Sequence, residues 1–336
     1  MNRGIVGLMV AATLGCGETA TEPVLLADGF LAFVSRRDGN DEIYVMGRDG
    51  GVGNVTRHPD EDRAPVWSPD GRRIAFTRGV AGERDVLVVR PDGSELLNVS
   101  PHGADDFDPS WSPDGRRLAF VSDRDGDQEL YRYDIATGEL TNVTNDPAPD
   151  FDPAWSPDGT HIAFTSGRGL RAAIYVLDLA RGTTTRLTQA LPADQTAPTW
   201  SPDGRFVAYE SNADGASDVI IAPVAGGDPS NVSAHPAHDV AASWSPDGSR
   251  LAFLSNRDGN WEVYSAAPDG SALFNVTQLS STESRPMWSP GGSEIAYETR
   301  RAGNWDVWVS STDGQVSFPL TTHIGNDGSP AWRPCL

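Results

Sequence analysis

A short string built around tryptophan recurs through the sequence at almost constant spacing. Trp-Ser-Pro-Asp-Gly, or its variant Trp-Ser-Pro-Gly-Gly, begins at six of seven regularly spaced tryptophans, which are Trp67, Trp111, Trp155, Trp200, Trp244, Trp288 and Trp332. Successive tryptophans are 44 or 45 residues apart. A period of this length indicates a chain built from stacked copies of one supersecondary unit, rather than two ordinary domains.

Each copy contains four short runs of β-forming residues separated by turn residues. The Ser-Pro-Asp-Gly turn is followed by an aliphatic-Ala-aromatic triplet, as at residues 74–76, then by a run such as 86–89 and a short run such as 98–100. None of these runs has the apolar periodicity of a helix. Four-stranded units that repeat roughly every 40–45 residues are typical of a β-propeller, in which each unit is a blade around an axis.

The two ends of the repeat array are incomplete in complementary ways. Residues 30–56 supply three strands without a leading Trp string, and residues 328–333 supply one strand with nothing after it. We therefore predict an all-β, seven-bladed β-propeller of four-stranded blades, closed by the C-terminal strand joining the N-terminal blade, which hides two sheet edges. In an alternative alignment residues 24–26 form a degenerate inner strand, but Trp332 is then left without a sheet.

The first residues predict export. Arg3 precedes an apolar run at residues 4–14, which is too short to span a bilayer and is typical of a secretory signal. The string Ala-Thr-Leu-Gly-Cys ending at Cys16 resembles the lipobox of bacterial lipoproteins, which implies acylation of Cys16. We expect a lipoprotein-type signal peptide at 1–15, a short linker at 16–29 and the propeller domain at 30–336.

This interpretation places the protein in the cell envelope, lipid-anchored on the periplasmic or outer surface. The alternative is plain secretion, in which Cys16 could pair with Cys335, because closure of the ring brings the chain ends near each other.

The charge of the chain restricts its partners. The formal net charge is −21, and every basic residue other than histidine is arginine. A strong negative field argues against nucleic acid and anionic membrane as partners, so we expect membrane contact only through the N-terminal lipid anchor. We also expect a monomer.

Acidic residues recur five positions before the anchoring tryptophans. They are Asp62, Asp106, Asp150, Asp239, Glu283 and Asp327, with Asp194 as the expected equivalent in the repeat that has one extra residue. An acidic ring near the axis would hold a cation such as Ca²⁺ or grip a basic peptide. The alternative is structural, with each carboxylate accepting hydrogen bonds from its own loop.

Four histidines occur nine residues before a tryptophan, at His58, His102, His235 and His323. This position follows the outer strand, so the side chains belong at the rim, too far apart to share one metal ion. We predict loop residues and no metal site.

Two tryptophans fall at a turn position that is mostly polar in the other repeats. Trp261 and Trp305 lie near several arginines of the same and adjacent turns, which are Arg257, Arg300, Arg301, Arg36 and Arg37. These turns open on the face that also carries the links between blades, which we call the top face. Exposed Trp beside Arg is enriched at interface hot spots, so this set predicts a protein-binding patch. The alternative is that each Trp covers its own hairpin.

The repeat resembles a known family. The runs WSPDGRRLAFVSDRDGDQELY at 111–131 and WSPDGSRLAFLSNRDGNWEVY at 244–264 are similar to the WD-like propeller repeats of the TolB family. The resemblance covers residues 30–334 and implies a periplasmic protein that binds partners of the envelope-spanning Tol–Pal system. Members of that family also carry an N-terminal α/β domain and usually six blades, whereas this chain has about fourteen residues between Cys16 and the first strand and seven predicted blades.

Our leading hypothesis is a non-enzymatic cell-envelope binding module whose top face binds a protein or peptide, or a cell-wall glycan, without a cofactor. The sequence contains no Gly-x-Ser-x-Gly or His-Glu-x-x-His motif. The alternative is a propeller enzyme acting at the channel mouth, such as a metal-assisted polysaccharide lyase or hydrolase.

Overall fold

A computed structural model of the chain describes residues 30–189 and 191–334. The expected signal peptide, the linker, Cys16 and Cys335 lie outside the described residues, so these expectations stay predictions. Among the described residues, no helix is long and apolar enough to cross a membrane.

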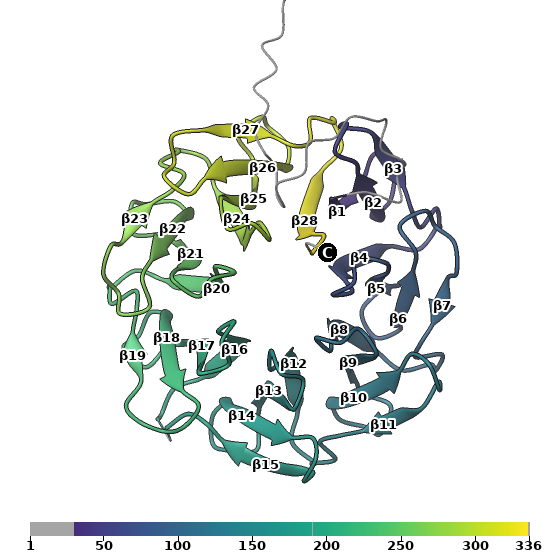
Figure 1. Cartoon of the computed structure of the whole chain (residues 1–336), viewed down its shortest axis with the longest axis vertical. Coiled ribbons are helices and arrows are strands. Elements are labelled where there is room, and N and C mark those ends of the chain that lie inside the picture. Colours follow the sequence, from purple (N-terminus) through teal and green to yellow (C-terminus); the bar gives the residue numbers. More distant parts are fainter. Residues whose placement is uncertain (1–29, 190, 335–336) are drawn as a thin grey trace, which may run out of the picture.

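Seven four-stranded antiparallel sheets surround a central axis (Figure 1). We number these sheets as blades 1 to 7 and give their strands from the axis outward. Blade 1 contains β28 (Asp327–Trp332), β1 (Leu31–Ser35), β2 (Glu42–Met46) and β3 (Val52–Asn54). Blade 2 contains β4 (Asp62–Trp67), β5 (Ile74–Arg78), β6 (Asp85–Val89) and β7 (Leu97–Asn98). Blade 3 contains β8 (Asp106–Trp111), β9 (Arg117–Ser122), β10 (Glu129–Asp134) and β11 (Leu140–Asn142).

The other four blades follow the same order. Blade 4 contains β12 (Asp150–Trp155), β13 (His161–Ser166), β14 (Ala173–Asp178) and β15 (Thr183–Arg186). Blade 5 contains β16 (Gln195–Trp200), β17 (Phe206–Ser211), β18 (Asp218–Pro223) and β19 (Ser230–Asn231). Blade 6 contains β20 (Asp239–Trp244), β21 (Leu251–Ser255), β22 (Glu262–Ala266) and β23 (Phe274–Asn275). Blade 7 contains β24 (Glu283–Trp288), β25 (Glu294–Thr299), β26 (Asp306–Ser311) and β27 (Ser317–Pro319).

Blade 1 is completed by strands from opposite ends of the array. β28 pairs antiparallel with β1, with Trp332 opposite Leu31 and Asp327 opposite Ser35. The predicted seven-bladed ring and its closure by the last strand are therefore confirmed, and β28 takes the inner position that the alternative alignment gave to residues 24–26.

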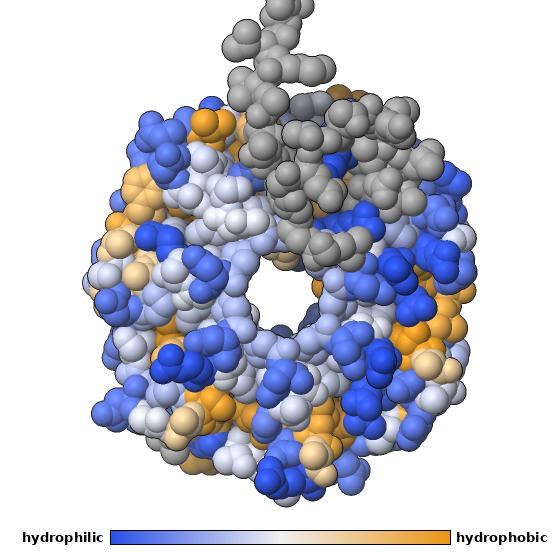
Figure 2. All heavy atoms as spheres, in the orientation of Figure 1, coloured by the Kyte–Doolittle hydropathy of each residue, from blue (hydrophilic) through white to orange (hydrophobic). Residues whose placement is uncertain are grey.

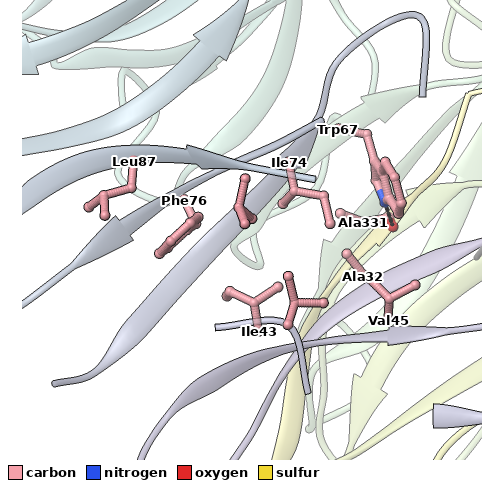
Figure 3. Packing of buried hydrophobic residues seen from close by; sticks show 10 residues of the cluster. Ala32, Ile43, Val45, Trp67, Ile74, Phe76, Leu87 and Ala331 are labelled. Carbon is pink, nitrogen blue, oxygen red and sulfur yellow. Dashed lines mark hydrogen bonds between the residues drawn. The ribbon is translucent and has the colours of Figure 1, made fainter. Parts of the chain in front are cut away.

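The hydrophobic core lies between adjacent blades. In the layer between blades 1 and 2, Ala32 and Val45 of one sheet pack against Trp67, Ile74 and Phe76 of the next (Figure 3). The indole N–H of Trp67 donates to the carbonyl of Ala331, 3.0 Å away. Each of the other six anchoring tryptophans makes the same bond to the inner strand of the preceding blade. Each regularly spaced tryptophan in the sequence thus provides one hydrogen bond between two adjacent blades.

The Ser-Pro-Asp-Gly turn joins the two inner strands of a blade. In blade 2, the backbone N–H of Gly71 donates to Ser68, and Asp70 accepts from the N–H of Arg72. Gly71 has φ +60°, and a Cβ there would lie 2.6 Å from Nε of Arg333. Glycine is needed at this turn for both its backbone conformation and the close approach of the neighbouring blade.

Every inner strand contains a β-bulge. Its third residue has a left-handed backbone, with φ between +49° and +56° in all seven blades, at Ala64, Asp108, Asp152, Ala197, Ala241, Arg285 and Ser329. The strand pairing shifts register at this point, as between Arg63 and Val66 of β4. The bulge turns these side chains toward the axis, where they line the central channel visible in Figure 2.

Candidate functional site

The predicted acidic ring does not line the channel. The carboxylate residues at the start of the inner strands are buried, with 0–1% exposure for Asp62, Asp106, Asp150, Asp239, Glu283 and Asp327. The channel is lined instead from two residues further along each strand. The expectation that these acids sit openly at the axis was wrong, because the bulge lies between them and the anchoring tryptophan.

Five of these buried carboxylates are the counter-ions of arginines in the same blade. In blade 6, Arg257 Nη2 lies 3.0 Å from Asp239, and the guanidinium carbon lies 4.7 Å from the ring centroid of Tyr264. Blades 1, 3 and 4 repeat this arrangement with Arg37–Asp327, Arg124–Asp106 and Arg168–Asp150, and blade 2 pairs Arg78 with Asp62. A repeated, buried ion pair of this kind holds the blade together, which supports the structural interpretation of the acidic positions.

Blade 5 lacks both members of this pair. The register places Gln195, opposite Ser211, at the position that is acidic elsewhere. Asp194 precedes the strand and lies 3.5 Å from Arg171 with its side chain 40% exposed, so its assignment to the ring was wrong. The arginine position of this blade is occupied by Ala213. Where the arginine is missing, the acid is missing too.

Blade 7 keeps both members but does not pair them. Glu283 accepts hydrogen bonds from Ser281 and Thr299, while the Arg301 guanidinium stacks 4.6 Å from the ring centroid of Trp308. The Oε2 atom of Glu283 is buried without a hydrogen-bond partner. Burial raises the pKa of Glu283 to about 7, and the nearby charge of Glu262 adds to this shift.

Most members of the predicted protein-binding patch are not free to bind. The side chains of Arg257 and Arg37 are only 9% and 19% exposed and serve as ion-pair partners within their blades. Arg36 is more exposed but is paired with Asp41 and Glu61. Trp261 is half-buried and packs against the core cluster between blades 6 and 7. Trp261 is therefore in part a partner of the core and not a freely exposed ring.

The remaining members form a smaller group on blade 7. Trp305 is half-buried and lies outside the core clusters of the described residues. The exposed Arg300 stacks 5.5 Å from the ring centroid of Trp305. Among residues 30–189 and 191–334, neither Arg300 nor Arg301 has a carboxylate within ion-pair distance. The link to blade 1 adds Ile324, which is 92% exposed. We call Arg300, Trp305 and Ile324 the blade-7 patch.

Three charged residues of the channel were not predicted from the sequence. The channel has a volume of about 520 Å³. Four of the seven bulge positions carry Ala or Ser, and the other three carry Asp108, Asp152 and Arg285. The signal was present in the sequence: each of these three residues precedes a proline two positions before an anchoring tryptophan, where the other repeats have a small residue.

A second tier of polar side chains comes from the neighbouring strands. Glu210 of β17 accepts from the N–H of Ala241 at 2.8 Å, and Glu298 of β25 accepts from the N–H of Ser329 at 2.6 Å. Glu298 also lies 3.3 Å from Nε of Arg285. The second tier thus fixes the bulge of the following blade and places two carboxylates directly behind the channel lining.

The charge of Asp152 acts on two neighbouring carboxylates. Although Asp108 is exposed to the channel, the surrounding wall desolvates its carboxyl and raises its pKa, and the charge of Asp152 raises it further. Burial raises the pKa of Glu210 as well, with a contribution from Asp152. Arg84 and Arg285 act in the opposite direction on Asp108. One side of the channel is therefore strongly negative.

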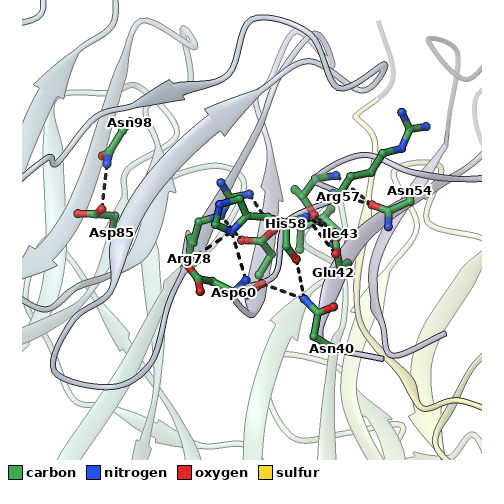
Figure 4. A network of polar contacts seen from close by, with 12 residues as sticks. Asn40, Glu42, Ile43, Asn54, Arg57, His58, Asp60, Arg78, Asp85 and Asn98 are labelled. Atoms are coloured by element: carbon green, nitrogen blue, oxygen red, sulfur yellow. Dashed lines mark hydrogen bonds and ion pairs between the residues drawn. The ribbon is translucent and has the colours of Figure 1, made fainter. Parts of the chain in front are cut away.

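The histidines after the outer strands belong to the loops. His58 Nδ1 accepts from the N–H of Asp60 at 3.2 Å, and Asn40 donates to the His58 carbonyl (Figure 4). His235 and His323 accept from the N–H two residues ahead in the same way. No group of three or more His, Cys, Asp or Glu residues suited to a metal ion occurs within the part of the chain that the structure describes.

Solved structures of several activities share this fold. TolB from Acinetobacter baumannii is 21% identical, with coverage of 91% of this chain and 67% of that chain, and a TM-score of 0.60. Oligogalacturonate lyase from Vibrio parahaemolyticus is 18% identical, with coverage of 83% and 85% and a TM-score of 0.68. A puromycin-hydrolyzing peptidase of Mycobacterium tuberculosis is 15% identical, with coverage of 89% and 55% and a TM-score of 0.69. At these identities the similarity shows the fold alone.

Sequence comparison is more specific. The Tol-Pal system protein TolB of Syntrophus aciditrophicus (strain SB) is 36% identical over 76 residues, which is 20% of this chain and 16% of that protein. The chain thus matches less than a fifth of that relative's length. The model of the TolB beta propeller domain matches residues 52–150, 98–190 and 130–336. Because these matches together extend over residues 52–336, the chain belongs to the TolB beta propeller domain family.

Proposed function

We propose that this protein is a non-enzymatic binding module of the cell envelope, which captures a protein or peptide on the top face of its propeller. The observation that carries the proposal is the blade-7 patch, where Arg300 stacks on Trp305 without an acidic partner among the described residues. Trp and Arg dominate interface hot spots because they offer large contact areas together with hydrogen-bond donors. Family membership and the Tol-Pal name of a relative support an envelope role.

The location and anchoring belong to the same proposal. We propose that the protein resides in the envelope through acylation of Cys16, and that its partner is an envelope protein or peptide, with cell-wall glycan as the other ligand class. The net charge of −21 favours a partner with a basic surface.

A partner-capture experiment tests the patch. Envelope extract is passed over the immobilised protein, its Trp305→Ala plus Arg300→Ala variant, and a Leu170→Ala control. Leu170 is fully exposed on a turn of blade 4, so its removal deletes apolar surface away from the patch. We expect the double variant to lose the captured partner and the control to retain it, with unchanged thermal unfolding. Equal capture by all three proteins would remove the basis for this site.

An enzyme acting at the channel mouth is the second candidate. Asp108, Asp152 and Arg285 break the pattern of small residues at the bulge, as acid–base groups of an active site would. The shared fold with oligogalacturonate lyase suggests an acidic polysaccharide as the first substrate to assay, with and without divalent metal. Turnover that disappears in Asp152→Asn would favour this candidate over the binding module.

A further inference from the structure

The central channel has a composition distinct from the top face. Its negative side is formed by Asp108 of blade 3 and Asp152 of blade 4, and Glu210 of blade 5 lies behind the lining, where it accepts from the N–H of Ala241. The charge of Asp152 reaches both other carboxylates, because it raises the pKa of Asp108 and of Glu210. Like charges held together in a partly desolvated site are unfavourable unless a cation neutralises them.

Two polar side chains, Asp108 of blade 3 and Thr77 of the preceding blade, are without hydrogen-bond partners among the described residues. No hydrogen bond of Asp108 to another described residue is found, whereas Asp152 accepts from Thr165 at 2.9 Å and from the N–H of Ala197 at 3.2 Å. Thr77 is 6% exposed, and its hydroxyl is also unpartnered. A buried hydroxyl without a partner costs free energy and marks a place where a ligand donor or acceptor is missing.

The strand register shows where Thr77 points. Thr77 lies opposite Arg63 in the same register position as Thr165, Glu210 and Glu298 in their blades. Those three side chains reach channel-lining bulges, as the bonds to Ala197, Ala241 and Ser329 show. In blade 2 the bulge residue is Ala64 instead of an aspartate, so the Thr77 hydroxyl has lost the partner that Thr165 finds in Asp152.

Proline is the commonest residue in the rest of the channel wall. Six of the seven bulge residues are followed by proline, at Pro65, Pro109, Pro153, Pro198, Pro286 and Pro330, and all six line the cavity. Proline rings present methylene surface and no backbone donor. A channel with a proline wall and a cluster of carboxylates matches a ligand whose cationic groups are joined by methylene chains.

Arg285 is the one arginine among the described residues that line the channel, and it does not compensate the negative charge of Asp108 and Asp152. Arg285 is 3.3 Å from Glu298, so this pair is close to neutral. Arg285 also lowers the pKa of Asp108 from the other side of the channel, which makes it the internal competitor of any bound cation. Asp108 and Asp152 remain as the excess negative charge of the channel wall.

We propose that the central channel binds primary alkylammonium groups, with Asp108 and Asp152 as the principal acceptors, the Thr77 hydroxyl as a further one and the proline ring as the surface for the methylene chain. The chemistry has two sources, a free linear polyamine or the lysine side chains of a protein segment. A cavity of about 520 Å³ accommodates either.

Titration calorimetry on the full chain tests the site, with spermidine in one arm and a short capped peptide containing two lysines in the other. We expect binding in at least one arm, and the arm that binds identifies the source. Asp108→Asn and Asp152→Asn each should weaken it about tenfold, because each removes one charge-assisted hydrogen bond. Arg285→Gln should strengthen it several-fold by removing the internal competitor.

Asp214→Asn is the matched control, since Asp214 is exposed on a turn of blade 5 outside the channel and the substitution changes net charge equally. Unchanged thermal unfolding shows that each variant is folded. The inference is overturned if neither ligand binds, or if Asp214→Asn weakens binding as much as Asp108→Asn. Trp305→Ala should leave amine binding unaltered, so failure here and failure of the proposed top-face function are distinguishable.

Discussion

Glu283 is a buried carboxylate that its blade does not pair with an arginine. Its counterparts in five other blades are neutralised by an arginine, but in blade 7 the equivalent arginine, Arg301, stacks on Trp308 instead. Trp308 occupies the place that tyrosine holds in blades 1, 3 and 6, opposite Tyr297 of β25. Arg301 stacks on the larger ring of Trp308, and the carboxyl of Glu283 accepts hydrogen bonds from two hydroxyl groups instead.

Glu283→Gln should therefore stabilise the protein at alkaline pH. The folded pKa of about 7 lies above the ordinary value of 4.5, so the folded state binds the proton more tightly than the unfolded state. The stabilisation from this group is complete below pH 4.5 and is lost as pH rises through 7. We expect the variant to be about 2 kcal/mol more stable than the parent at pH 8 and equal to it at pH 4.5. Urea unfolding at the two pH values measures this, and an equal effect at both would contradict it.

The sequence identified six of the seven positions as acidic, but neither the Gln195 position of blade 5 nor the surroundings of the carboxylates. Counting back from tryptophan cannot reveal that a bulge with left-handed backbone separates Asp62 from the channel. Blade 5 held the available clue, because Gln195 and Ala213 replace the acid and the arginine together. Charged residues at the bulge, such as Asp108, were hidden by the variability of that position in the repeat.

At the level of the elements, the buried ion pair ties the first strand of a blade to the turn that ends its second strand. In blade 6, Asp239 opens β20, and Arg257 follows β21 while also donating to Ser255. The hairpin made by the Ser-Pro-Asp-Gly turn is thereby fastened at its open end. Strand bounds were predictable because turn residues flank each run, whereas this fastening depends on side-chain directions that the pattern does not contain.

Removing one partner of this pair should cost far more than removing both. Asp239→Gln leaves a guanidinium that is 9% exposed without its counter-ion, which should destabilise the fold by about 3 kcal/mol. Asp239→Gln combined with Arg257→Ala recreates the residue pair of blade 5 and should be clearly less destabilising than the sum of its single variants. Denaturant unfolding of the three variants gives the coupling energy. Additive losses would show that the two residues act independently.

The whole molecule is a ring in which one sheet is assembled from distant parts of the chain. Each core layer lies between two of the seven similar blades. The hydrogen bonds of the anchoring tryptophans run from blade to blade around the axis. The sequence predicted this architecture because an unbroken period with complementary ends has one natural closed arrangement. It could not predict function with the same certainty, since the fold is shared by binding proteins and enzymes.

Removing residues 328–336 should open the ring. The truncation deletes nearly all of β28, including Trp332 and the Ala331 carbonyl that accepts from Trp67. We expect thermal unfolding to shift down by more than ten degrees, or folding to fail. A synthetic peptide of residues 326–334 supplied in excess should restore part of the lost stability, which separates loss of the strand from general damage. Unfolding that is unchanged by the truncation would disprove the seal between β28 and β1.

The pairing of β28 with β1 also determines when blade 1 can be completed during biosynthesis. Ser35 and Asp327 face each other in the finished sheet but are 292 residues apart in the chain. While the ribosome makes the intervening blades, β1 has an unsatisfied row of backbone groups toward the axis, which is a hazard for association with other nascent chains. Blade 1 cannot be completed until β28 has been translated, so a chaperone or export factor that shields β1 would act on this protein during that interval.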